Sequence, residues 1–136
     1  LGDACPKAKG IIHLGMTSQD VNDNCELRLI ASSLVLVTKK LSVAAIALSE
    51  QAARFVSLPT LAFTHYQAAQ PVTVGRRFAQ WAYELTLAAE GLTHVILRVC
   101  ETRRGLRGAT GSQASYLALF SGDARRVDEL EARMYY

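Results

Sequence analysis

The strongest constraint on this fold is a long stretch of sequence that contains no helix breaker. No glycine or proline occurs from Asp20 to Leu58. Apolar residues recur in it at steps of three and four, at Leu27, Ile30, Leu34, Val37, Leu41, Ala44, Leu48, Ala52 and Phe55. This spacing predicts one apolar face of a long helix over 20–58. Pro59 should end the helix, because the residue before a proline disfavours helical backbone.

A second apolar series predicts a second long helix, over 71–104. Its members are Phe78, Trp81, Leu85, Ala88, Leu92, Val95 and Val99. Pro71 suits the first helical turn, where its missing N–H costs nothing, and Gly105 follows cationic residues at the far end. Residues 59–70 are then expected to form a loop. Residues 105–136 should form a glycine-rich turn and short helices, the last one capped by Asp123.

The predicted helices are too long for a small globule. Each has roughly 30 to 37 residues and spans about 45 to 55 Å. A compact chain of this length has a radius of gyration of roughly 14 Å. Two antiparallel helices cannot cover each other's wide apolar faces, so further helices must come from elsewhere. We therefore expect an all-α chain that oligomerises extensively, that belongs to a longer polypeptide, or both.

Composition excludes several classes of function. Half of the 136 residues are hydrophobic and the net charge is only +3, without a basic run of the kind that binds nucleic acid. We see no apolar stretch near the roughly 20 residues of a membrane helix, and no signal peptide at the start. Three widely spaced cysteines predict neither a disulfide framework nor a zinc site. A reducing, cytoplasmic location fits best.

The first candidate site is the segment that leads into the first helix, residues 15–20. Thr17 and Ser18 would place two hydroxyls and several unpaired backbone N–H groups at a helix N-terminus, which suits a carboxylate. From the residues alone, an ordinary helix cap is the simpler interpretation, with Asp20 favouring the helix dipole.

The second candidate is His65, which follows Thr64 between the two helices. A histidine beside a hydroxyl can donate a proton near neutral pH, although most such histidines only hydrogen-bond a loop. We expect His94 to be solvated and His13 to be a packed loop residue. The glycines at 105–111 predict a turn between helices rather than a phosphate loop, because no Gly-Lys-Ser/Thr ending is present.

Four blocks of sequence change this assessment. They are CPKA at 5–8 with GIIHLGMTS at 10–18, LPTLAFTHYQ at 58–67, QPVTVGRR at 70–77 and RGLRGATGSQAS at 104–115. In this order they resemble the animal-type adenylosuccinate lyases of the fumarase and aspartase superfamily. The likeness covers nearly the whole chain, as a central portion of such a lyase, and weakens only at 134–136.

The resemblance implies a homotetramer with a central bundle of long antiparallel helices and active sites shared between subunits. It implies a C–N lyase that releases fumarate from adenylosuccinate and from succinyl-aminoimidazole-carboxamide ribotide in purine biosynthesis. Thr17 and Ser18 would hold the succinyl group of this small-molecule substrate. Thr64 would help to position the substrate, and His65 would protonate the departing nitrogen. No metal or organic cofactor is implied.

The chain also departs from the family pattern. The family's catalytic serine lies in a Ser-Ser-x-Met-Pro-x-Lys-x-Asn loop, and no such run occurs here, so we expect the isolated chain to be inactive. The family's upstream histidine segment and its downstream phosphate-binding arginines are also missing. Met16, Ala68 and Arg107 stand where Ala, Pro and Lys are usual. Two alternatives stay open: a non-catalytic helical bundle, and another fumarate-releasing lyase such as argininosuccinate lyase.

Overall fold

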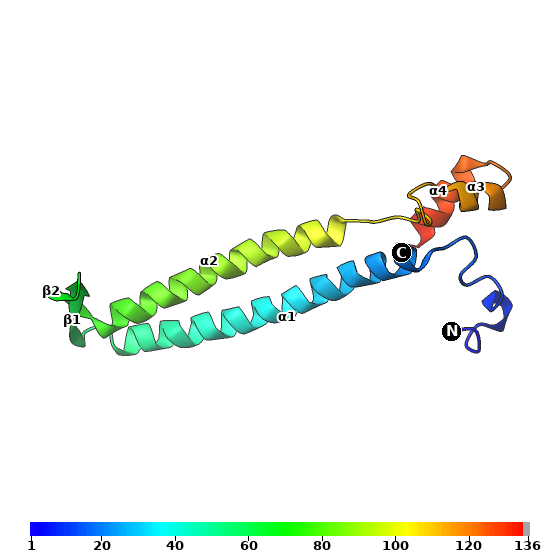
Figure 1. The fold of residues 1–136 in the computed structure, drawn as a ribbon. Helices are drawn as coiled ribbons and strands as arrows, with labels where there is room; N and C mark the ends of the chain where they lie inside the picture. Colours follow the sequence, from blue (N-terminus) through cyan, green and yellow to red (C-terminus); the bar gives the residue numbers. More distant parts are fainter. Residues whose placement is uncertain (135–136) are drawn as a thin grey trace. The chain divides into compact units, whose positions relative to one another are not determined.

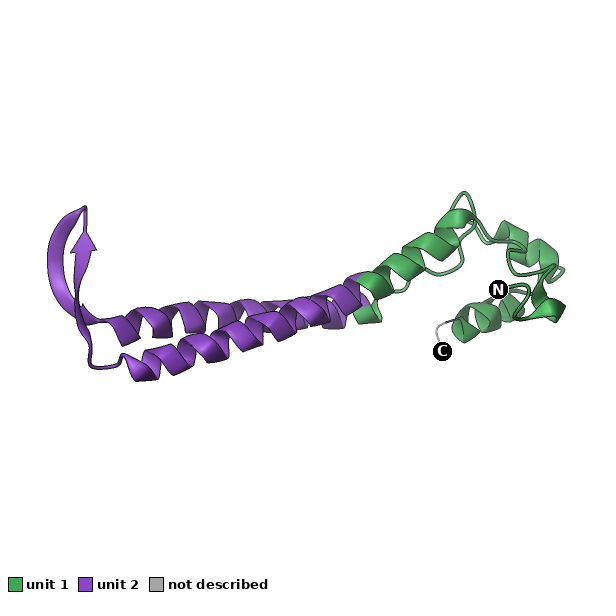
Figure 2. Ribbon diagram, turned by 90° about the horizontal axis from the view of Figure 1, so that it is seen from below, with its two compact units in different colours: residues 1–29, 100–136 green, residues 30–99 purple. Residues whose placement is uncertain are grey.

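A computed structural model describes residues 1–134 and confirms the all-α class, with one small sheet added (Figure 1). The elements in chain order are a 3-10 turn η1 (Pro6–Ala8), α1 (Ser18–Arg54), β1 (Pro59–Thr64), β2 (Gln67–Thr73), α2 (Val74–Glu101), α3 (Ala114–Leu119) and α4 (Ala124–Arg133). The chain has two compact units (Figure 2): residues 1–29 with 100–136 form unit 1, and residues 30–99 form unit 2.

In unit 2, α1 and α2 run side by side in opposite directions (Figures 1 and 2). Their less exposed residues recur at alternating steps of three and four, the heptad pattern of helices that pack lengthwise. In α1 and the turn after it these are Ala31, Leu34, Thr38, Leu41, Ala45, Leu48, Ala52 and Phe55. In α2 they are Gly75, Phe78, Ala82, Leu85, Ala89, Leu92, Ile96 and Val99.

Each predicted apolar series was wrong by one residue at three positions, of nine in the first series and of seven in the second. The predicted positions that are exposed instead are Ile30, Val37, Ala44, Trp81, Ala88 and Val95. Ala82 is buried where Trp81 was expected, and Trp81 is half exposed. At this position the physical reason is size: a small residue lets the two helices approach closely, and a tryptophan there would hold them apart.

The close approach is most evident where α2 begins. The Gly75 N–H donates to the Phe55 carbonyl at 2.9 Å. A Cβ at Gly75 would lie 2.5 Å from the Ala52 carbonyl oxygen and 2.7 Å from the Val56 Cα, so only glycine fits there. The rings of Phe55 and Phe78 stack beside this contact, with centroids 6.1 Å apart. This junction closes the unit at one end of the helix pair.

The helix boundaries near the junction differ from the predicted ones. The first helix ends at Arg54 rather than at residue 58. The second begins at Val74 rather than at Pro71, because the Thr73 hydroxyl accepts the Arg76 N–H at 3.1 Å and so acts as the cap. The helix ends at Glu101, before the glycine-rich turn.

Residues 59–70 were predicted to be a loop, and this was wrong. Strands β1 and β2 form an antiparallel hairpin over 59–73, with Pro59 opposite Thr73 and Thr64 opposite Gln67. Pro71, expected at a helix start, pairs with Leu61 inside β2. Proline is tolerated there because a two-stranded sheet has only edge strands.

Many apolar side chains of α1 remain exposed. They lie on several sides of the helix and include Leu29, Ile30, Leu36, Val43 and Ile46. An 18-residue window of α1 has a mean hydropathy of 1.7, so α1 meets the length and composition of a membrane span, and our expectation that no stretch came close was wrong. The heptad spacing of its half-buried residues is what a helix in a packed bundle shows.

Unit 1 has a small core of its own. Leu106, Tyr116 and Val127 are almost fully buried, and four partly buried residues pack on them: Met16, Leu117, Phe120 and Leu130. The predicted cap of the last helix is confirmed, because the Asp123 carboxylate accepts the Arg125 N–H at 3.1 Å.

Two glycines of α2 should respond oppositely to alanine. Gly75→Ala should lower the free energy of unfolding by about 1 to 3 kcal/mol, because its Cβ would overlap the α1 backbone. Gly91→Ala meets nothing within 4 Å and should raise the free energy by about 1 kcal/mol through helix propensity. Denaturant unfolding of both variants measures this. Equal effects of the two substitutions would contradict the close packing at Gly75.

Candidate functional site

Thr17 and Ser18 stand at the N-terminus of α1. Ser18 is the first helical residue, and its side chain is exposed. The first N–H groups of a helix have no intrahelical acceptor, so those of Ser18 and Gln19 point out of the helix end. Within residues 1–134, no partner is found for these two N–H groups or for the hydroxyls of Thr17 and Ser18. This helix end therefore offers four donors to a negatively charged group.

A buried carboxylate holds the loop in place from behind. Asp20 is only 5% exposed. Its Oδ2 accepts the Thr17 N–H at 3.1 Å, and its Oδ1 accepts the N–H of Arg107 at 2.8 Å and of Gly108 at 3.1 Å. The Tyr116 hydroxyl donates to Oδ2 at 3.4 Å. Asp20 thus joins the start of α1 to the glycine-rich turn, a role that goes beyond the helix-dipole effect expected from the sequence.

These contacts shift the ionisation of both side chains. Burial raises the pKa of Asp20, but the backbone N–H groups of Arg107, Thr17 and Gly108 outweigh it, so the pKa is lowered overall and the carboxylate stays charged. Burial, followed by the nearby charge of Asp20, raises the pKa of Tyr116 to about 12. The hydroxyl therefore remains a donor to the carboxylate at neutral pH.

The glycine-rich turn is built to present its N–H groups to Asp20. Gly108 has a φ of 65°, a left-handed conformation that favours glycine. The Asn24 amide donates to the Gly105 carbonyl at 3.1 Å, and its oxygen accepts the Arg104 N–H at 3.2 Å. The Glu131 carboxylate accepts the Leu106 N–H at 3.1 Å. The turn is therefore held from α1 and from α4, and it is not open to bind an anion at Asp20.

The positions that depart from the family pattern have defined surroundings. Met16 packs against the core cluster of unit 1 rather than standing free beside Thr17. The Arg107 guanidinium forms an ion pair with Glu131 at 3.3 Å. Ala68 pairs with Phe63 in the hairpin.

His65 occupies the turn of the hairpin. His65 and Tyr66 have φ values of 51° and 62°, as the two central residues of a type I′ turn require. Neither is glycine, asparagine or aspartate, so each costs of order 1 to 3 kcal/mol, a strain that is common at functional sites. Thr64, His65 and Tyr66 are all exposed. The turn therefore presents an imidazole and a threonine hydroxyl at the surface of unit 2.

The structure brings together the members of each predicted pair, Thr17 with Ser18 and Thr64 with His65, but it places the pairs in different units. The 37 residues of α1 separate them along the chain, a helix length of about 55 Å. His94 is exposed as expected, whereas His13, expected to be packed, is exposed too. Within residues 1–134, no group of three His, Cys, Asp or Glu side chains is placed to hold a metal ion.

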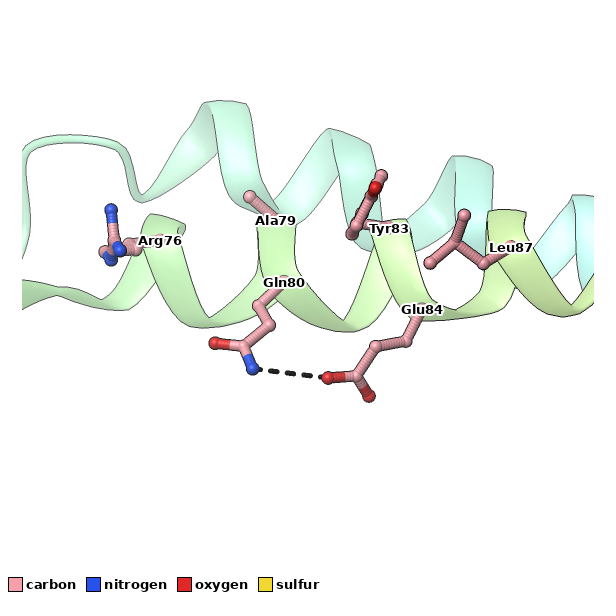
Figure 3. Close-up of a pocket in the computed structure, with 6 residues that line it drawn as sticks. All are labelled: Arg76, Ala79, Gln80, Tyr83, Glu84 and Leu87. Carbon is pink, nitrogen blue, oxygen red and sulfur yellow. Dashed lines mark hydrogen bonds between the residues drawn. The ribbon is translucent and has the colours of Figure 1, made fainter.

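A shallow groove follows the exposed side of α2 (Figure 3). Its lining comes from this helix alone: Arg76, Ala79, Gln80, Tyr83, Glu84 and Leu87. The Gln80 amide donates to the Glu84 carboxylate at 3.2 Å. This pair is satisfied within one helix, and the rest of the groove is largely apolar, so the groove suits a packing surface better than a chemical site.

Comparison with known proteins identifies the family. The family described as Lyase matches residues 2–121. The chain belongs to this lyase family. It is 45% identical over 130 residues to the adenylosuccinate lyase of Schizosaccharomyces pombe, and 39% identical over 133 residues to that of Saccharomyces cerevisiae. These matches confirm the resemblance inferred from the four sequence blocks. The matched regions cover 96% and 98% of this chain, but the lyase chain spans only 27% of the length of each relative.

Solved structures show the same helical arrangement in lyases and related enzymes. The 3-carboxy-cis,cis-muconate lactonizing enzyme from Pseudomonas putida matches with a TM-score of 0.74 at 30% identity, over 94% of this chain and 29% of that one. The fumarate lyase from Mesorhizobium sp. BNC1 matches with a TM-score of 0.75 at 28% identity, over 90% of this chain and 29% of that one.

The contact between Asp20 and Tyr116 in this lyase chain predicts how the unfolding free energy changes at alkaline pH. Tyr116 ionises above about pH 10 when unfolded, but only near 12 when folded, so the stability it contributes is lost as pH rises between these values. Tyr116→Phe should remove this loss. The unfolding free energy of the wild type, relative to Tyr116→Phe, should fall by about 2 to 3 kcal/mol from about pH 10 to about pH 12. Parallel pH profiles of the two proteins would contradict the burial of the hydroxyl against a carboxylate.

Proposed function

We propose that this chain forms central helices and two active-site loops of an adenylosuccinate lyase. Such an enzyme releases fumarate from adenylosuccinate to leave AMP, and from succinyl-aminoimidazole-carboxamide ribotide in purine biosynthesis. The observation that carries the proposal is the 45% identity over 130 residues to the S. pombe enzyme, since that region includes most of the chain and both candidate loops. We also propose a cytoplasmic location.

Thr17 and Ser18 would bind the succinyl carboxylate. The two hydroxyls and the N–H groups of Ser18 and Gln19 converge at a helix N-terminus, where the partial positive charge favours an anion. As the proton leaves the carbon next to this carboxylate, negative charge builds up on the carboxylate oxygens. Donors already in place stabilise that charge without having to reorganise.

His65 would act as the general acid. In the elimination, a base removes a proton from one succinyl carbon, the electron pair forms the double bond of fumarate, and the adjacent C–N bond breaks. The departing nitrogen takes up the broken bond's electrons and needs a proton, which a positioned imidazolium can supply. Thr64, opposite Gln67 at the base of the same turn, would help to hold the substrate against His65. The resemblance assigns the base to a serine loop that this chain does not contain.

The length of α1 supports active sites that are shared between subunits. A helix of 37 residues spans about 55 Å, so its two ends cannot contact one small substrate within a single subunit. In a homotetramer of antiparallel helices, the hairpin of one subunit can meet the Thr17–Ser18 loop of another. The exposed apolar side chains of α1 and the groove on α2 support such an assembly, because surfaces of this kind are association surfaces.

A chimera tests the roles of these residues. This chain should replace the matching segment of the S. pombe adenylosuccinate lyase, which then supplies the serine loop and the remaining site. We expect the chimera to release fumarate from adenylosuccinate. His65→Ala should lower kcat by about 100-fold or more, the scale of losing a general acid. Ser18→Ala should chiefly raise KM, because its contact is made in the ground state and the transition state alike.

His94→Ala is the matched control, since His94 is exposed on α2 and outside both loops. It should leave kcat and KM unchanged. A tetrameric chimera without lyase activity would favour the non-catalytic bundle. Turnover of argininosuccinate in preference to adenylosuccinate would favour the other lyase. Activity that survives His65→Ala would exclude His65 as the acid.

A further inference from the structure

Asp20 lies at the meeting point of three segments of unit 1, and its hydrogen bonds divide between its two oxygens. Oδ1 accepts the N–H of Arg107 at 2.8 Å and of Gly108 at 3.1 Å. Oδ2 accepts the N–H of Thr17 at 3.1 Å and of Gly108 at 3.2 Å, together with the Tyr116 hydroxyl at 3.4 Å. Every partner is a donor. The site is therefore matched to an ionised carboxylate rather than to a neutral amide.

We propose that Asp20 is a positioning residue that fixes the ligand-binding loop by accepting the Thr17 N–H. This inference rests on the proposed role of Thr17 and Ser18 in binding a carboxylate. The Asp20 carboxylate accepts the Thr17 N–H and leaves the N–H groups of Ser18 and Gln19 directed outward. It thereby sets which backbone donors a ligand meets and holds the loop against the 107–108 turn.

The charge of Asp20 would repel a bound carboxylate if it were not compensated. Donors from three segments surround it instead, and backbone N–H groups are rigid because the chain on either side is held. The loop behind the Thr17 bond is also packed, since the Tyr116 ring lies against Gly15 and a Cβ there would come within 3.1 Å of the ring. The hydrogen bonds from these protein groups thus compensate the negative charge of Asp20, and the N–H groups of Ser18 and Gln19 remain available to the ligand.

An isosteric substitution of Asp20 can remove its bond to the Thr17 N–H and keep its bonds to the 107–108 turn. In Asp20→Asn, the amide oxygen is expected to keep the Oδ1 position, where it accepts the shorter bonds from the 107–108 turn. The NH2 group then takes the Oδ2 position. The Tyr116 hydroxyl can reverse and accept from it, but the Thr17 N–H cannot, and the Gly108 N–H keeps only its bond to the oxygen at the Oδ1 position. Asp20→Asn therefore releases the Thr17 N–H and retains the anchor to the turn.

Asp23→Asn is the matched control. Asp23 lies on α1 one turn after Asp20 and also carries a charge, but its oxygens accept from Gln19 and Arg104 side chains and not from the 15–18 loop. Both substitutions remove one negative charge near the same helix end. Only Asp20→Asn removes the acceptor of Thr17.

Amide hydrogen exchange tests the positioning without any enzyme activity. In the wild-type chain, the Thr17 N–H should exchange more slowly than those of Ser18 and Gln19. Asp20→Asn should speed exchange at Thr17 by about tenfold, and Asp23→Asn by less than about twofold. An unprotected Thr17 amide in the wild type would overturn the proposal even if Asp20→Asn failed to fold. Equal exchange in the two variants would also overturn it.

Kinetics in the chimeric lyase test the consequence for the ligand. Asp20→Asn should raise KM for adenylosuccinate by about tenfold with a much smaller change in kcat, whereas Asp23→Asn should match the parent. If Asp20 had only a structural role, Asp20→Asn would lower the fraction of active enzyme and leave KM unchanged. An unchanged KM would therefore contradict the positioning role. If the exchange result holds but the chimera is inactive, the proposed function fails and the role of Asp20 in holding the loop stands.

Discussion

The excess of apolar surface on α1 is the constraint on which the rest of the structure depends. One chain offers α1 a single partner, α2, and the heptad seam between them covers only one side of each helix. Side chains such as Leu36 and Ile46 remain exposed on other sides. Apolar side chains exposed on several sides of a helix are surfaces that favour association. This surface supports the assembly proposed for the chain, and in that assembly the length of the helices decides where each loop is presented.

The segments at the two ends of α1 are held by different local structures. At the first end, a buried carboxylate and a glycine-rich turn hold Thr17 and Ser18 so that donors point outward. At the other, a strained two-residue turn carries His65 at the tip of a hairpin. In the proposed function, one end binds an anion and the other delivers a proton. An elimination reaction that releases a dicarboxylate needs both functions at one place.

The long helices and the Asp123 cap could be predicted because periodicity and capping are local properties of the sequence. The seam was wrong at Trp81 because Trp81 and Ala82 are both apolar, and only the spacing between helices selects the smaller one. The hairpin was missed because its turn uses His65 and Tyr66 instead of the usual glycine or asparagine. The adjacency of Thr17 to Ser18 and of Thr64 to His65 is given by the sequence, but the bonds from Arg107 and Gly108 to Asp20 could not be predicted, because these two partners lie more than 80 residues away in the sequence.

The most direct test of this account is subunit complementation in the chimeric lyase. Subunits with His65→Ala and subunits with Ser18→Ala should each form impaired tetramers. If one active site combines the two ends of α1 from different subunits, mixed tetramers contain some sites with both residues intact. Fumarate release should then recover well above that of either parent. Verified mixed tetramers whose activity equals the average of the two parents would contradict the shared site.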